Sequence, residues 1–167
     1  DKEIAQKFSN AILKNSEKLS YLLEDILNLS TIESGEYNLE LAENGVSDIF
    51  KTSINSVLSN NPDVKIINNI SSDIEVICDV KALSQVIDNL IENSVKYGIS
   101  EEFNEIIINM KDQGSKVRFE IEDHGQGIPA DQRERVFERF FRIQNNNTSS
   151  KEGTGLGLSI VKNLVNL

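Results

Sequence analysis

Positive charge is scarce in this chain. Its 167 residues include 17 lysines and arginines against 27 aspartates and glutamates, which gives a formal net charge of −10 at pH 7. A field of that sign repels the phosphate backbone of nucleic acids, so we expect no nucleic acid partner. It does not exclude a small anionic ligand, because such a ligand needs only a local cluster of donors and a metal ion.

Cysteine and long apolar runs are scarce as well. The single cysteine, Cys78, cannot form an internal disulfide, which favours a reducing compartment and predicts a cytoplasmic chain. No run approaches the roughly 20 apolar residues of a membrane-spanning helix, and no signal peptide is recognisable. Any membrane anchor of a parent protein is therefore expected outside this chain. With 38% apolar residues the chain can still bury a core, and its length suits one domain with an appendage.

Residues 2–34 form the longest periodic segment. Apolar residues step along it mostly by threes and fours, and no glycine or proline interrupts the pattern before Gly35, which predicts a helix ending there. One helix cannot bury so wide a stripe, which suits a bundle core, so we expect a homodimer through residues 4–32. A helix folded onto its own domain is the alternative. The stripe comprises Ile4, Phe8, Ala11, Leu19, Leu22, Leu23, Ile26, Leu27, Leu29 and Ile32, with polar breaks at Asn15 and Glu33.

After Gly35 the pattern changes to short strands and helices. Asp79 is expected to cap one helix, and Ser47 or Asp48 another. Strands grouped against helices, without βαβ alternation, indicate an α+β fold built as a two-layer α/β sandwich. The polar segment 144–151 has no period and is expected to be mobile. Strands are expected at residues 37–42, 64–70, 74–78, 105–111 and 116–122, and helices at about 47–58, 80–97, 131–139 and from 155 to the end.

A polar row on the helix of residues 80–97 carries the first candidate chemistry. Asn89, Asn93 and Lys96 lie together on one side of this helix, away from its apolar side. Side-chain carbonyl oxygens are ligands that a hard ion such as Mg²⁺ accepts, with its other ligands coming from phosphates and water. Taken alone, a solvated helix face is the favoured explanation of this row.

Two glycine-rich segments carry the remaining candidate chemistry. Asp123 ends a strand, and Gly125 and Gly127 allow the backbone to turn sharply against a flat ligand whose exocyclic amine the carboxylate could bind; an ordinary turn explains this segment equally well. Residues 153–158, GTGLGL, open the last helix, where backbone N–H groups and the helix dipole favour an anion. This loop lacks the lysine of a nucleoside-triphosphatase P-loop and does not follow a strand, so that family is disfavoured.

The order and spacing of these segments carry a resemblance. NLIENSVKYG, DHGQGIP, FERFFR and GTGLGLSIVKNLV follow one another, and both Asn93 to Asp123 and Asp123 to Gly153 are 30 positions apart. In this the chain resembles the catalytic domain of bacterial two-component sensor histidine kinases. SEKLSYLLEDILNLSTIESGE resembles the second helix of their dimerisation and phosphotransfer domain. The resemblance thus implies a partial dimerisation domain at residues 1–35 and, at residues 36–167, a catalytic domain of the histidine-kinase and gyrase ATPase fold without its last hairpin.

The resemblance implies an ATP and Mg²⁺ site on the helix and the first glycine turn. Asn93 would bind Mg²⁺, Asn89 would support the phosphates, Lys96 would meet a phosphate, and Tyr97 would pack near the base or sugar. Asp123 would bind the adenine amino group, with room made by Gly125 and Gly127. Glu92 is either solvated or faces an incoming acceptor.

The resemblance also implies a lid over the triphosphate at about residues 128–152, starting at Ile128. Arg139, Arg142 and Lys151 would contact phosphates, and Phe137 and Phe140 would anchor the hinge. The second glycine segment would complete the phosphate site through Gly153, Thr154, Gly155, Leu156, Gly157 and Leu158. The catalytic residues on this interpretation are Asn93, Lys96 and Glu92.

The implied activity is transfer of the γ-phosphoryl of ATP to a histidine, for relay to an aspartate in the receiver domain of a response regulator. Related gyrases and chaperones carry a water-activating glutamate where this chain has Asn89, so transfer is favoured over hydrolysis. The only histidine, His124, lies in the first glycine turn and is expected to be a bystander, so the acceptor would lie outside this chain. An ATP-binding pseudokinase or a phosphatase-biased module is the alternative, and an anti-sigma-factor serine kinase a third.

Overall fold

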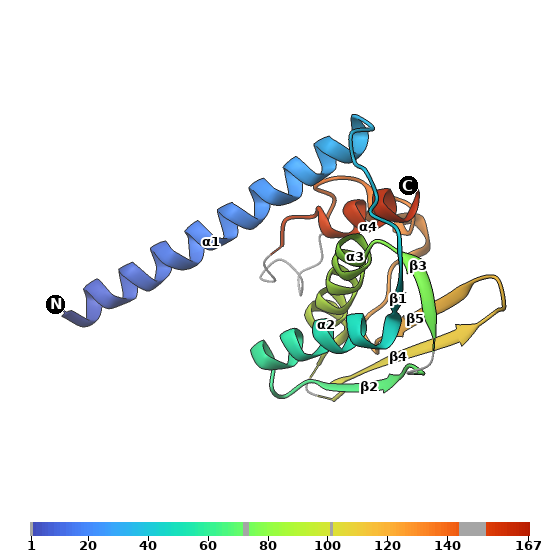
Figure 1. Ribbon diagram of the computed structural model, residues 1–167. Helices are drawn as coiled ribbons and strands as arrows, with labels where there is room; N and C mark the ends of the chain where they lie inside the picture. The colour runs from blue at the N-terminus through green and yellow to red at the C-terminus, as the bar shows by residue number, and fades with distance from the viewer. Residues whose placement is uncertain (1, 72–73, 101, 144–152) are drawn as a thin grey trace. The chain divides into compact units, whose positions relative to one another are not determined.

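The structure is a computed structural model that describes residues 2–71, 74–100, 102–143 and 153–167 (Figure 1). The chain divides into two compact units, residues 1–37 and residues 38–167. The predicted boundary after residue 35 lies close to this division. The polar segment 144–151, predicted to be mobile, lies outside the described residues.

The first unit is one helix, α1 (Lys2–Glu33). It ends in a Schellman turn, in which Glu36 N–H donates to Thr31 O (3.1 Å) and Gly35 N–H donates to Ile32 O (3.2 Å). Gly35 has φ +72°, a left-handed conformation that glycine adopts without a steric penalty, which explains why the helix ends there. None of the helices in the described part of the chain is long and apolar enough to cross a membrane.

The second unit consists of a helical layer on one face of a three-stranded sheet (Figure 1). The sheet has the order β2-β4-β5, with β2 parallel to β4 and β4 antiparallel to β5. A separate antiparallel pair, β1 with β3, joins Ala42 to Cys78. The strands are β1 (Ala42–Gly45), β2 (Lys65–Asn69), β3 (Glu75–Cys78), β4 (Glu105–Asp112) and β5 (Val117–Glu122), and the helices are α2 (Val46–Asn60), α3 (Val80–Asn93) and α4 (Gly157–Val165).

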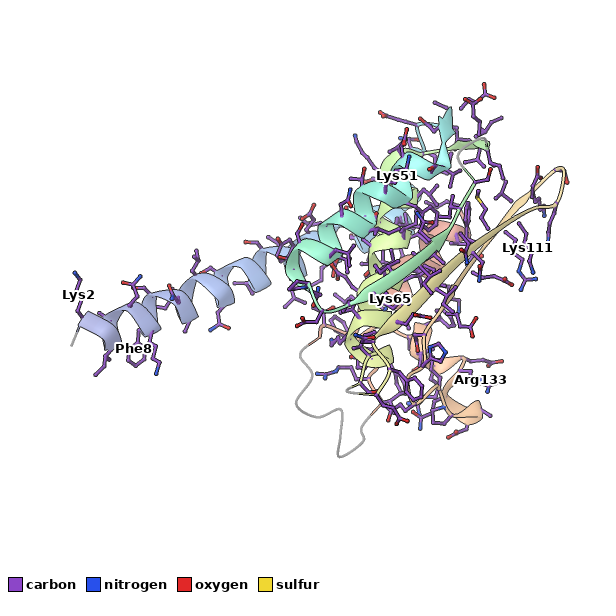
Figure 2. All side chains as sticks on the ribbon, turned by 90° about the horizontal axis from the view of Figure 1, so that it is seen from below. Lys2, Phe8, Lys51, Lys65, Lys111 and Arg133 are labelled. Carbon is purple, nitrogen blue, oxygen red and sulfur yellow. The ribbon has the colours of Figure 1, made fainter. Side chains whose placement is uncertain are left out.

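The core lies between the helices and the sheet because each element presents one apolar face. Phe50 of α2, Ile87 and Ile91 of α3, and Ile106 and Ile108 of β4 are buried there. The opposite face of the sheet carries polar side chains beside the half-buried Ile67 and Ile107, and Figure 2 labels two of its lysines, Lys65 and Lys111. It carries an ion pair between Lys65 and Glu105 (2.6 Å), a hydrogen bond from Asn69 to Asn109 (2.9 Å) and an ion pair between Arg118 and Glu120 (2.9 Å). The predicted two-layer α+β sandwich is confirmed.

The N-terminal part of the second unit differs from the sequence prediction. The strand expected at residues 37–42 is wrong, because the pairing of β1 with β3 starts only at Ala42. Before it, Glu40 N–H donates to the Asp79 carboxylate (2.8 Å) and not to a strand. Neither Ser47 nor Asp48 caps α2, since the helix starts at Val46 with Gly45 as its N-cap. The cap predicted for α3 is confirmed, as Ala82 N–H donates to Asp79 Oδ1 (2.9 Å).

Three further boundaries differ. The helix predicted to reach residue 97 is α-helical to Asn93 and then continues as a π turn, Ser94–Gly98. Residues 131–139 form no single helix but two 3-10 turns, Ala130–Gln132 and Arg135–Phe137. The last helix starts at Gly157, two residues later than predicted. The parallel pairing of β2 with β4 was not foreseen either, because β3 and α3 lie between them in the sequence.

Candidate functional site

The polar row of α3 faces the start of α4. Asn89 donates from Nδ2 to the carbonyl of Gln85 (2.8 Å), which fixes the orientation of its amide. Its Oδ1 lies against Gly157, so closely that a Cβ on Gly157 would overlap it. Asn93 follows one helical turn later, and both asparagines are half-buried. The structure therefore places an amide oxygen of α3 against the N-terminus of α4.

The π turn directs the next two side chains to the second glycine segment. Lys96 Nζ lies 4.9 Å from the centroid of the Tyr97 ring. A Cβ on Gly153 would overlap Lys96 Nζ and would lie 3.6 Å from the Tyr97 hydroxyl. A π turn holds one residue more than an α turn, and such turns occur frequently at functional sites. Lys96 and Tyr97 thus meet Gly153, a residue 57 and 56 positions away in the sequence.

The turn after β5 packs on the end of the same π turn. Gly125 N–H donates to Asp123 Oδ1 (3.0 Å). A Cβ on Gly98 would overlap the Asp123 side chain, and one on Gly125 would lie 2.5 Å from Tyr97 O and 2.8 Å from Gly98 Cα. Only glycine fits at both positions. The exposed Asp123 carboxylate is therefore held against Gly98, where it can accept a hydrogen bond from an amine.

The second glycine segment is joined to the phenylalanine segment. Phe140 N–H donates to Gly155 O (2.9 Å), and a Cβ on Gly155 would lie 2.8 Å from Phe140 C. Gly155 has φ +74°, and Phe140 has φ +59°, an uncommon value for a residue other than glycine. Thr154 Oγ1 accepts a hydrogen bond from Leu156 N–H (3.1 Å), and Leu156 is fully buried.

The remaining predicted residues lie around this set. The ammonium of Lys162, on α4, lies 5.9 Å from the centroid of the Phe137 ring. Ile128 is 41% exposed, and its carbonyl accepts a hydrogen bond from Arg133 Nε (3.3 Å); Arg133 is labelled in Figure 2. Lys151 lies outside the described residues. Gly127 has φ +69°, Leu158 is half-buried, and Glu92, Arg139 and Arg142 are exposed.

Two features of the site were missed by sequence reasoning. Gly98 supports Asp123, and the signal that could have found it is its place at the end of NLIENSVKYG, directly after two predicted site residues. Phe103 stacks on His124, with ring centroids 5.5 Å apart and an interplanar angle of 15°. No sequence signal marks Phe103, because the stack depends on how two distant segments meet.

The donor chemistry suits a metal ion that takes most of its ligands from phosphates and water. Among the residues that the structure describes, no group of three His, Cys, Asp or Glu side chains could hold a metal ion. Asn93, half-buried near the end of α3, supplies a neutral carbonyl oxygen. Mg²⁺ keeps several waters and is bound through few protein ligands together with substrate phosphates, so this donor set suits it.

Comparison with known proteins agrees with this geometry. Residues 78–167 match the family described as histidine kinase-, DNA gyrase B-, and HSP90-like ATPases. The chain is 28% identical over 166 residues to the sensor-like histidine kinase SenX3 of Mycolicibacterium smegmatis, covering 98% of this chain and 43% of that protein. It is 30% identical over 172 residues to the sensor protein kinase WalK of Staphylococcus aureus, covering 99% of this chain and 40% of that protein.

A solved structure of a full-length protein is similar to this chain as well. Full-length ShkA in complex with AMPPNP superposes with a TM-score of 0.77 at 25% identity, over 95% of this chain and 33% of that one. The chain spans less than half the length of these relatives.

Proposed function

Because this chain belongs to the family of histidine kinase-, DNA gyrase B- and HSP90-like ATPases, we propose that its second unit binds Mg-ATP and transfers the γ-phosphoryl group to a histidine. The acceptor would lie on another helix of the parent protein or of its dimer partner. From that histidine the phosphoryl group would pass to an aspartate of a response regulator receiver domain.

One observation carries this proposal, namely that three segments distant in sequence meet through glycines. Asn89 lies against Gly157, Lys96 against Gly153, and Asp123 against Gly98. An amide, a cation and a carboxylate thus line one continuous stretch from the middle of α3 to the end of its π turn. This order suits a nucleotide whose phosphates lie toward α4 and whose base lies at Asp123. The N-terminus of α4 adds backbone donors and a favourable dipole for the phosphates.

The roles of the side chains follow from their chemistry. The Asp123 carboxylate accepts a hydrogen bond from the 6-amino group of adenine, and guanine carries an oxygen acceptor at that position. Lys96 places a positive charge on the phosphates as the bond between the β-γ bridging oxygen and the γ-phosphorus breaks. Asn93 would hold Mg²⁺, which neutralises charge on the phosphates when bound. The acceptor imidazole nitrogen forms the new bond to phosphorus, and ADP leaves.

The proposal favours transfer over hydrolysis because of Asn89. An amide cannot accept a proton from water, so this position cannot serve as the general base of a hydrolase. The Asn89 amide is instead oriented by Gln85 and lies against Gly157. Positioning and charge neutralisation are the contributions that phosphoryl transfer requires of the protein.

The helix α1 would supply dimerisation. Its exposed apolar side chains include Ile4 (56%), Phe8 (66%) and Leu19 (69%), and a stripe of this kind gains free energy when a second copy covers it. A homodimer through residues 4–32 is the arrangement that we propose.

The test is transfer in trans. The chain is incubated with ATP labelled at the γ-phosphate and Mg²⁺, with and without a helix that carries an acceptor histidine from a related kinase. We expect label on the added helix only, as an acid-labile and base-stable phosphoramidate, and no label on the chain itself. Nucleotide binding without transfer would instead support an ATP-binding regulatory module. Labelling of the chain alone would contradict the proposal and make His124 or a hydroxyl group the acceptor.

A further inference from the structure

Two aromatic rings stack beside the carboxylate to which we assign base recognition. The rings of Phe103 and His124 are nearly parallel, at 15°, with centroids 5.5 Å apart. Phe103 belongs to the loop that follows the π turn, and His124 is the residue after Asp123. Phe103 is 45% exposed and His124 is exposed as well, so core packing does not explain the pair.

Phe103 is held in place independently of His124. Ser100 N–H donates to Phe103 O (2.7 Å), and Phe103 N–H donates to Ser100 Oγ (3.1 Å), so two hydrogen bonds join Phe103 to Ser100. The next residue, Asn104, donates from Nδ2 to Asp63 O (3.1 Å), and its carbonyl accepts a hydrogen bond from Lys65 N–H (2.9 Å). Hydrogen bonds therefore hold the backbone of Phe103 against Ser100, and they hold the next residue, Asn104, against the start of β2.

His124 belongs to the turn after β5. The Asp123–Gly125 turn follows the end of β5, and its internal hydrogen bond runs from Gly125 N–H to Asp123 Oδ1. Asp123 packs against Gly98, and its neighbour His124 packs against Phe103. Gly125 packs against Gly98 as well, so two contacts hold the turn to the π turn, and the contact between His124 and Phe103 holds it to the loop that follows. The contact with that loop opposes tilting of the turn about the π turn, and with it tilting of the Asp123 carboxylate.

We propose that Phe103 and His124 are positioning residues, whose stack holds Asp123 in the orientation that binds the base. The inference rests on the function proposed above and assigns His124 a task other than accepting a phosphoryl group. Stacked aromatic pairs contribute enough free energy that loss of one ring should weaken nucleotide binding about two- to tenfold. Because the stack acts through Asp123, its loss weakens binding of every adenine nucleotide by the same factor, whatever phosphates or metal the nucleotide carries.

The experiment compares two ligands by calorimetry, ADP in EDTA and AMPPNP with Mg²⁺. The variants are Phe103→Ala, His124→Ala, the double variant and His124→Phe, which keeps a ring but no ring nitrogen. We expect each alanine variant to lose the same factor for both ligands. We expect the double variant to be no weaker than the weaker single variant, and His124→Phe to retain the affinity of the unaltered chain. Asn93→Ala is the contrasting variant, with a larger loss for AMPPNP with Mg²⁺.

A second readout reports the stack itself. In the unaltered chain the ring current of Phe103 should shift the His124 ring protons in the NMR spectrum, and Phe103→Ala should remove that shift. Thermal unfolding without ligand shows whether each variant is folded.

The outcomes separate the two proposals. If the unaltered chain binds neither ligand, the proposed function fails, and this inference fails with it. If the unaltered chain binds both ligands and the folded alanine variants bind them as tightly, the inference alone is overturned. A loss in His124→Phe equal to that in His124→Ala would show that the imidazole nitrogens act and would overturn stacking as the cause.

Discussion

The backbone amide of Phe140 donates a hydrogen bond to the carbonyl of Gly155, at 2.9 Å. This bond joins a residue inside the segment 128–152, which the resemblance identifies as a lid, to a residue just after that segment, and both residues have positive φ. The Gly155 Cα also lies so close to Phe140 that no side chain fits between them. The geometry of this junction depends on a glycine for two separate reasons, its left-handed backbone and its missing Cβ.

Gly155→Ala should therefore destabilise the chain by more than the left-handed backbone alone would cost, which is about 1–2 kcal/mol. The matched control is Gly114→Ala, because Gly114 has φ +81° but nothing within 4 Å of an added Cβ. Chemical denaturation of both variants measures the difference. Equal losses in the two variants would contradict the crowding at Phe140.

Asp123→Asn should weaken adenine nucleotide binding about ten- to a hundredfold, because a charge-assisted hydrogen bond of roughly 1.5–3 kcal/mol is lost. Asp112→Asn is the control: Asp112 Oδ1 accepts a hydrogen bond from Gly114 N–H (2.8 Å), as Asp123 Oδ1 does from Gly125, but in the β4–β5 turn. Calorimetry with ADP is the measurement. Unchanged affinity in Asp123→Asn would place the base elsewhere.

Asn93→Ala should weaken binding of AMPPNP with Mg²⁺ more than binding of metal-free AMPPNP. The reason is that Asn93 acts through the metal ion, and the metal ion bridges protein and phosphates. Isothermal titration with AMPPNP, in Mg²⁺ and in EDTA, measures both losses in one series. Identical losses in the two conditions would make Asn93 a structural residue.

Asp79→Ala should lower the free energy of unfolding by about 1 kcal/mol at neutral pH. The hydrogen bonds from the backbone amides of Ala82 and then Glu40 hold the pKa of the Asp79 carboxyl below its ordinary value of 3.8. A lowered folded-state pKa contributes stability that is present above the unfolded-state pKa and is lost as the pH falls through the folded-state pKa. The difference between the two proteins should therefore shrink below about pH 4. Denaturation at pH 7 and at pH 3 checks this, and a difference independent of pH would contradict the role of the charge.

Much of this fold follows from local pattern. The two segments on either side of Gln113 and Gly114 predicted β4 and β5, and Asp79 marked the start of α3, because both signals are contained in a few neighbouring residues. The β1 strand could not be placed in the same way. Residues 37–42 alternate as a strand does, but which residues pair is decided by β3, which lies more than 30 positions away in the sequence.

The site shows the same division between local and distant information. The four motifs allowed candidate site residues to be named, because the order and spacing of the motifs are visible in one sequence. Their contacts were not predictable, since Gly98 and Phe103 become part of the site only when the turn after β5 packs against the π turn and the loop after it.

The π turn Ser94–Gly98 constrains the number of residues in this part of the chain. It holds one residue more than an α-helical turn, so loss of any one residue there would allow the helix to continue regularly. Each helical residue turns the chain by about 100°, and a deletion would therefore rotate Lys96 and Tyr97 away from Gly153. The amino acids at positions 94 and 95 can change more freely than their number, so homologous chains that share this site should align without gaps between Asn93 and Gly98.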